Sequence, residues 1–159
     1  MLDEFNALPA ADAEAELLAC CATPAWARRV AAARPFPDAD ALVEEGERAF
    51  DALGWDEVAT AVAAHPRIGE RAAGADRESA WSRAEQAAVT AADVLAEANA
   101  EYERRFGMVF LIRATGRDGE EILAALRERL GNDEATEREV VRGQLREIVA
   151  LRLRKLVTA

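Results

Sequence analysis

Alanine, the residue with the highest helix propensity, occupies 38 of the 159 positions of this chain. Prolines, glycines and a Gly-Asn-Asp sequence interrupt this composition and separate segments of helical length. Because no low-complexity linker or internal repeat divides the chain, we expect residues 1–159 to form a single compact multi-helix domain with an all-α fold. The expected helices cover residues 10–21, 24–33, 38–53, 55–64, 82–105, 118–130 and 134–157.

Three apolar patterns indicate where this domain is buried. One face of the expected helix 82–105 carries apolar residues every three or four positions, and Asn99 lies among them. The expected helix 134–157 has a similar face, which includes Arg152. The run Met108–Ile112 is instead continuous and lies between glycines. Since no second strand is available to pair with it, we predict buried extended backbone or the start of a helix there.

The charge of the chain excludes several classes of partner. Lysine and arginine total 20 and aspartate and glutamate total 30, which gives a net charge of −10. Such a chain lacks the basic surface that binds nucleic acid or an anionic membrane. No apolar run approaches the roughly 18 residues of a spanning helix, and the acidic N-terminus does not resemble a signal peptide. We therefore expect a cytoplasmic protein with neither nucleic acid nor membrane as a partner.

The cysteines do not predict a metal site or a structural disulfide. Cys20 and Cys21 are adjacent, so they cannot link distant segments, and the chain has one histidine. The chain therefore has no Cys/His spacing of the kind that binds a metal. We interpret both cysteines as small apolar residues in a reducing compartment. A site made of carboxylates alone has no signal in the sequence.

The single histidine, His65, stands immediately before Pro66. Proline disfavours the helical conformation of the residue before it, so the preceding helix should end here and the imidazole should project from its end. Histidine exchanges a proton near neutral pH, which suits acid–base catalysis. A histidine that interacts favourably with the end of a helix explains the same position without any chemistry.

A second candidate is the sequence around Ser82 and Glu85, which have the spacing of a capping box at a helix start. The same first turn would present a hydroxyl, a carboxylate and the side-chain amide of Gln86. Its exposed N–H groups also favour an anion. The structural role and the binding role are compatible.

Two polar residues interrupt apolar faces. At the position of Arg152 an unpaired charge is costly. Its guanidinium either extends to solvent along its apolar stem or faces a pocket, where it would bind a carboxylate through two hydrogen bonds. We interpret Asn99 as a structural residue that bonds to backbone. With His65 and Glu85, Arg152 suggests a metal-free pocket for acid–base chemistry on a small anion.

Five ordered motifs carry a family resemblance that extends from Phe5 to Leu156. The interval of 20 residues between His65 and Glu85 also fits the pattern of that family. The motifs resemble those of the 2-oxo-4-hydroxy-4-carboxy-5-ureidoimidazoline (OHCU) decarboxylases, which catalyse the last step from urate to allantoin. They are His65–Gly69, Ser82–Gln86, Asn99–Tyr102, Phe106-Gly107 with Phe110, and Leu151–Leu153.

The resemblance implies an all-α homodimer that decarboxylates a small anionic ureidoimidazoline without a cofactor or a metal. By position, His65 is the catalytic histidine and Glu85 is the carboxylate that shares its proton transfers. Ala87-Ala88 and Met108 depart from the family pattern, which affects the local shape of the pocket. The implied substrate-binding residues are Pro66, Ser82, Gln86, Arg152 and the backbone of Phe110, Leu111, Ile112, Arg113 and Ala114.

Two other functions compete with this hypothesis. A non-catalytic helical binding module derived from the same family would be expected to have lost the histidine, the carboxylate or the arginine, and all three are present. Metal-assisted hydrolysis by His65 and Glu70 lacks further histidines to complete a ligand set. We therefore favour the decarboxylase, with (S)-allantoin as the product.

Overall fold

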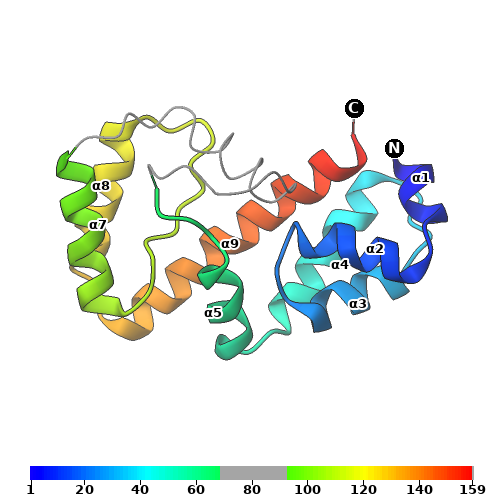
Figure 1. Cartoon of the computed structure of the whole chain (residues 1–159), viewed down its shortest axis with the longest axis horizontal. Coiled ribbons are helices and arrows are strands. Elements are labelled where there is room, and N and C mark those ends of the chain that lie inside the picture. Colours follow the sequence, from blue (N-terminus) through cyan, green and yellow to red (C-terminus); the bar gives the residue numbers. More distant parts are fainter. Residues whose placement is uncertain (69–92, 159) are drawn as a thin grey trace. The chain divides into compact units, whose positions relative to one another are not determined.

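The computed structural model describes residues 1–68 and 93–158, and every regular element in these two stretches is an α-helix (Figure 1). The prediction of an all-α fold is therefore confirmed. No helix in the described stretches is both long enough and apolar enough to cross a membrane. The helices are α1 (Leu2–Ala7), α2 (Ala10–Leu18), α3 (Pro24–Ala32), α4 (Ala39–Asp51), α5 (Trp55–Ala63), α7 (Asp93–Phe106), α8 (Gly119–Arg129) and α9 (Glu134–Val157).

The chain divides into two compact units. The first combines Met1–Ala61 with Arg146–Ala159, and the second is Val62–Leu145. Helix α9 contributes its first half to the second unit and its second half to the first. The single domain over residues 1–159 stays a prediction.

Aspartate side chains determine where several helices begin. Asp38, Asp118 and Asp133 each accept a hydrogen bond from the backbone N–H three residues later, at 2.8, 2.8 and 2.7 Å. These bonds satisfy N–H groups that have no partner inside the helix. The helices α4, α8 and α9 therefore begin within one residue of their predicted starts.

The first unit is closely packed around Trp26 of α3. The indole Nε1 donates a 2.9 Å hydrogen bond to the carbonyl oxygen of Gly46 in α4. A Cβ atom at Gly46 would lie 2.3 Å from Cδ1 of the buried Leu153 in α9 and 3.6 Å from the indole. The glycine therefore permits the close approach of these three helices.

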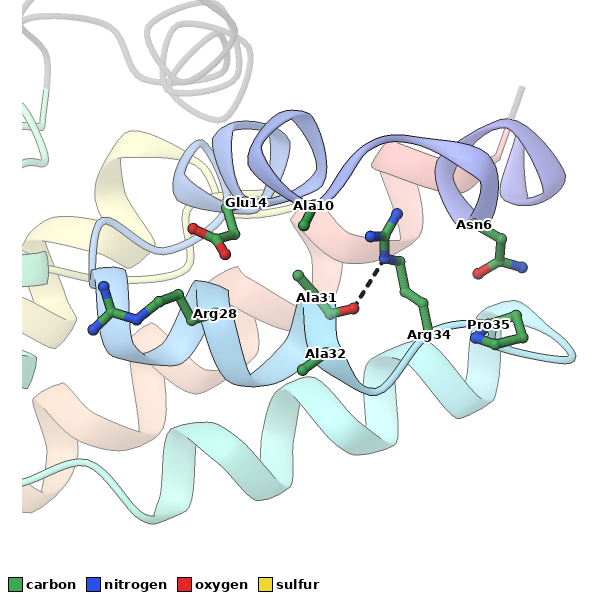
Figure 2. A pocket seen from close by; sticks show the side chains of 8 residues that line it. All are labelled: Asn6, Ala10, Glu14, Arg28, Ala31, Ala32, Arg34 and Pro35. Carbon is green, nitrogen blue, oxygen red and sulfur yellow. Dashed lines mark hydrogen bonds between the residues drawn. The ribbon is translucent and has the colours of Figure 1, made fainter.

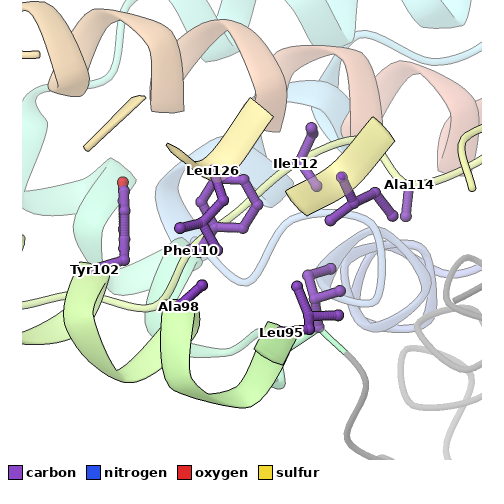
Figure 3. Close-up of a cluster of buried hydrophobic side chains, with 9 residues drawn as sticks. Leu95, Ala98, Tyr102, Phe110, Ile112, Ala114 and Leu126 are labelled. Carbon is purple, nitrogen blue, oxygen red and sulfur yellow. The ribbon is translucent and has the colours of Figure 1, made fainter. Parts of the chain in front are cut away.

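The second unit is built around an extended segment between α7 and α8. Phe110, Ile112 and Ala114 occupy alternate positions, and all three belong to one buried cluster with side chains of α7 and α8 (Figure 3). Alternation with period two is typical of extended chain. The prediction of buried extended backbone over Met108–Ile112 is confirmed, and the alternative of a helix start there is wrong.

Glycines with positive φ stand at both ends of this segment. Gly107 has a φ of 71° and Gly116 a φ of 80°. This region of backbone conformation strongly favours glycine, because a Cβ atom would clash with the backbone. The chain therefore turns out of α7 into the extended segment at Gly107, and turns again before α8 at Gly116.

Candidate active site

His65 follows the end of α5, as predicted from Pro66. The helix ends at Ala63, and the backbone N–H of His65 donates a 3.0 Å hydrogen bond to the carbonyl oxygen of Val62. His65 is 9% exposed and Pro66 is half-buried. The structure therefore places a largely buried imidazole just after the end of a helix.

Helix α7 anchors the loop that follows His65. Nδ2 of Asn99 donates a 3.3 Å hydrogen bond to the carbonyl oxygen of Ile68, and Nε of Arg67 lies 2.7 Å from Oε1 of Glu103. The structural role expected for Asn99 is confirmed, since its amide bonds to backbone. Among the described residues, Oδ1 of Asn99 has no hydrogen-bond partner.

The extended segment and the His65 loop belong to the same unit and share one core. Ile68 packs in the cluster that contains Phe110, Ile112 and Ala114. Two of the predicted site components, the histidine loop and the backbone segment, are therefore held by a common set of apolar contacts.

Side chains from α8 and α9 bond to the backbone of Phe110–Ala114. Nη1 of Arg129 donates a 2.7 Å hydrogen bond to the carbonyl oxygen of Leu111. The backbone N–H of Arg113 donates a 2.9 Å hydrogen bond to Oε1 of Gln144. Backbone groups of a non-helical segment need such partners when they are buried. These two bonds determine the orientation of the segment.

Arg129 is itself part of a buried polar network. Its Nε and Nη2 atoms lie 2.8 and 2.6 Å from Oε2 of Glu137, whose other oxygen accepts a 3.1 Å bond from Asn132. The hydroxyl of Tyr102 also donates to Glu137. Burial, followed by this bond, raises the pKa of Tyr102 well above its ordinary value. The Arg129 guanidinium also lies 4.4 Å from the centre of the Phe110 ring.

Sequence reasoning missed this network, although a signal was present. Glu137 lies four positions before Val141, on the apolar face of α9, and it is fully buried. Arg129 continues the spacing of Ile122 and Leu126 along α8 and is 7% exposed. A charged residue at an apolar position signals a buried partner. The signal that marks Arg152 in the sequence therefore also marks Arg129 and Glu137.

Arg152 belongs to the first unit and is completely buried. Its Nη1 atom donates a 3.4 Å hydrogen bond to the carbonyl oxygen of Ala19. The interpretation in which its guanidinium extends to solvent is therefore wrong, because no part of the side chain reaches the surface. The interpretation in which the guanidinium faces a pocket stays a prediction.

Several predicted residues lie outside the part of the chain that the structure describes. Ser82, Glu85 and Gln86 are among them, and so is Glu70 of the hydrolase alternative. The capping box at Ser82 stays a prediction for the same reason. Of the backbone segment, Phe110, Leu111, Ile112 and Ala114 are buried and Arg113 is half-buried.

A surface pocket of about 360 Å³ lies in the first unit, between α2, α3 and the loop that follows α3 (Figure 2). Glu14 and Arg28 line it, but none of the predicted site residues does. Arg34, at its other end, donates hydrogen bonds to the carbonyl oxygens of Ala31, Phe5 and Leu8 at 2.9, 2.9 and 2.8 Å. That guanidinium therefore links backbone segments of the first unit.

The cysteines agree with their interpretation as small apolar residues. Both Cys20 and Cys21 are buried thiols at the turn between α2 and α3, and backbone bonds to the Leu17 carbonyl end α2 earlier than predicted. Across residues 1–68 and 93–158, no three side chains of histidine, cysteine, aspartate or glutamate are grouped in a way that could hold a metal ion.

Known proteins resemble this chain over most of its length. The family model described as OHCU decarboxylase matches residues 6–154. An OHCU decarboxylase of Amia calva is 33% identical, over 84% of this chain and 81% of that protein. The uric acid degradation bifunctional protein TTL of Arabidopsis thaliana is 30% identical over 90% of this chain, which spans only 47% of that relative.

A solved structure of a known protein has a similar fold. The crystal structure of an OHCU decarboxylase in the presence of (S)-allantoin matches with a TM-score of 0.75 and 28% identity. The match covers 89% of this chain and 96% of the other. With the family model and the Amia relative, it shows that this chain belongs to the OHCU decarboxylase family.

Proposed function

We infer that this protein decarboxylates OHCU to (S)-allantoin, the last step of urate oxidation in purine catabolism. The observation that carries this inference is the family match across residues 6–154. One solved relative is an OHCU decarboxylase whose crystal structure was determined in the presence of (S)-allantoin, which supports the same reaction. The chain retains the histidine of the family motif, and that residue lies in an anchored loop at the end of α5.

The reaction needs little besides proton transfer and orientation. In OHCU a carboxylate and a hydroxyl share one ring carbon, next to a C=N bond. When the bond to the carboxylate breaks, its electron pair moves toward the C=N group, carbon dioxide leaves and the nitrogen gains a proton. The hydroxyl then loses its proton as it becomes a carbonyl, and the adjacent ring carbon gains one. Because the substrate accepts its own electrons, we propose a reaction without a metal or a cofactor.

His65 and Glu85 are the proposed proton carriers. An imidazole that exchanges its proton near neutral pH can accept the hydroxyl proton and return one to the ring. The Glu85 carboxylate would stabilise the positive charge that the imidazole acquires when it takes up a proton. Protonation of the ring carbon on one face would yield (S)-allantoin alone.

The other predicted residues are proposed to hold the substrate. Ser82 and Gln86 would orient the ring beside Pro66, and the backbone of Phe110–Ala114 would bind its amide groups. Arg152 would bind the carboxylate, because a guanidinium matches the two oxygens with two hydrogen bonds.

The function is tested by supplying the unstable substrate in place. Urate oxidase and hydroxyisourate hydrolase convert urate to OHCU, the purified protein is added, and circular dichroism follows allantoin. We expect a rapid signal of the S enantiomer, well above the slow change without protein. A well-folded protein that gives no acceleration would contradict the decarboxylase and favour the non-catalytic helical module.

We also propose that the protein is a cytoplasmic homodimer. Resemblance to the family supports the dimer, and the two buried free cysteines are typical of a reducing compartment. Light scattering during gel filtration measures the mass directly. A mass near twice 17.2 kDa is expected, and a mass of one chain at working concentration would contradict the dimer.

A further inference from the structure

The backbone of Phe110–Ala114 has an uneven distribution of hydrogen bonds. The Leu111 carbonyl and the Arg113 N–H bond to side chains of α8 and α9. The carbonyl oxygens of Arg113 and Ala114 accept bonds from Nε and the backbone N–H of Arg117, both at 3.0 Å. Among the described residues, no hydrogen bond reaches the N–H or the carbonyl of Ile112.

Ile112 is nevertheless fixed in place. The residue as a whole is 4% exposed, and its side chain packs in the cluster that also holds Phe110 and Ala114 (Figure 3). Since the residues on either side are tied to α8 and α9, the peptide groups of Ile112 cannot rotate to find partners. A fixed donor and acceptor that no described residue satisfies favour a ligand that supplies both partners.

The chemistry of this pair selects one part of the substrate. A carboxylate only accepts hydrogen bonds, so it would satisfy the N–H and leave the carbonyl without a partner. A ureide or ring amide carries an N–H next to a C=O, and it satisfies both groups at once. The peptide groups of Ile112 therefore match the neutral amide part of a ureidoimidazoline.

Given the substrate-binding role already proposed for the backbone of Phe110–Ala114, we propose that Gln144 and Arg129 are positioning residues that hold the N–H and carbonyl of Ile112 in the orientation that binds the amide part of the substrate. This inference rests on the proposed decarboxylase function. Gln144 holds the Arg113 N–H, and Arg129 holds the Leu111 carbonyl on the other side of Ile112. Glu137 is fully buried and fixes the guanidinium of Arg129 through two of its nitrogens.

Gln144 offers the sharper test, because it is half-buried and carries no charge, whereas a change at Arg129 would leave Glu137 as a buried unpaired carboxylate. Gln144→Leu removes the acceptor of the Arg113 N–H. We expect the KM for OHCU to rise about tenfold while kcat changes little, because the lost contact binds substrate and transition state alike. Gln144→Glu keeps an acceptor oxygen and is expected to restore the KM.

Glu139→Leu provides the matched control, since Glu139 is an exposed residue of the same helix. Its KM should equal that of the parent. If folded Gln144→Leu also has the parent KM, the positioning role is wrong. A purely structural Gln144 would instead lower the unfolding temperature without moving the KM. The parent enzyme is assayed first. If it has no activity, the proposed function is wrong, and this outcome is distinct from a failure of the positioning role.

A measurement on the parent protein keeps the inference testable if Gln144→Leu does not fold. With active parent enzyme, nuclear magnetic resonance follows the backbone amides as (S)-allantoin is added to saturation. We expect the Ile112 amide resonance to move strongly, while the Arg113 amide, already bonded to Gln144, moves much less. A saturated enzyme in which the Ile112 resonance does not move would overturn the inference.

Discussion

At the scale of single residues, His65 lies beyond the end of a helix, so its chemical role can be tested without disturbing the structure of that helix. The helix α5 ends two residues before it, so a change of its side chain leaves the helix intact. His65→Asn keeps hydrogen-bonding capacity but cannot exchange a proton near neutral pH. We expect kcat to fall by at least about 100-fold, the scale of general acid–base catalysis. The rate of (S)-allantoin formation measures the loss, and unchanged far-ultraviolet circular dichroism verifies folding. Near-normal turnover would exclude the catalytic role.

At Arg152, the contribution of the positive charge can be distinguished from that of the planar arrangement of the guanidinium donors. Arg152→Lys keeps a cation in the completely buried position but replaces the planar fork by a single ammonium group. If the fork binds the substrate carboxylate, the KM should rise at least about tenfold, the effect of about 1.4 kcal/mol of binding free energy. Steady-state kinetics and thermal unfolding are measured together. An unchanged KM with a large fall in unfolding temperature would indicate a structural arginine.

At the scale of the helices, the substitution of glycine by alanine is expected to have opposite effects on the free energy of unfolding at Gly143 and at Gly46. A Cβ atom added at Gly143 in α9 would have no atom within 4 Å, so Gly143→Ala gains helix propensity and should raise the free energy of unfolding by about 0.5–1 kcal/mol. Gly46→Ala places its Cβ 2.3 Å from Cδ1 of Leu153. Overpacking of this kind costs about 1–3 kcal/mol, which exceeds the gain in propensity.

Urea unfolding of both variants beside the parent measures these changes. The order of stability should be Gly143→Ala above the parent and Gly46→Ala below it. If Gly46→Ala were the more stable variant, the packing of α4 against Leu153 and Trp26 would not be as close as described.

The starts of those helices that are determined by nearby residues could be predicted from the sequence. Caps such as Asp38 and Asp118 act within three residues, so the starts of their helices were predicted closely. Helix α1 was missed, because it is one short segment whose only buried residue is Phe5. The backbone partners of Asn99 and Arg129 were not predictable either, since Ile68 and Leu111 lie 31 and 18 residues away from them in the sequence.

At the scale of the whole molecule, the network around Glu137 links stability to pH. The chain has one tyrosine, Tyr102, and its folded pKa is raised chiefly by burial and then by the bond to Glu137. Above the ordinary tyrosine pKa of about 10, the unfolded chain loses this proton while the folded protein retains it. The Tyr102 contribution to stability is therefore complete below about pH 10 and is lost progressively above it.

Urea unfolding between pH 8 and pH 11, both chosen to bracket the ordinary tyrosine pKa of about 10, measures this dependence. Stability should decline with rising pH more steeply in the parent than in Tyr102→Phe, which has no phenol to titrate. Equal slopes in the two proteins would mean that Tyr102 titrates normally when folded.

The extended segment lies between two glycines, and the effect of lengthening it depends on whether an odd or an even number of residues is inserted. Phe110, Ile112 and Ala114 reach the core because their positions share one parity counted from Gly107. A single residue inserted after Gly107 would reverse that parity, moving these three side chains out of the cluster and placing Leu111 and Arg113 at its positions. A pair of inserted residues would preserve it. The segment is therefore expected to accept changes of residue type more readily than an odd change in length.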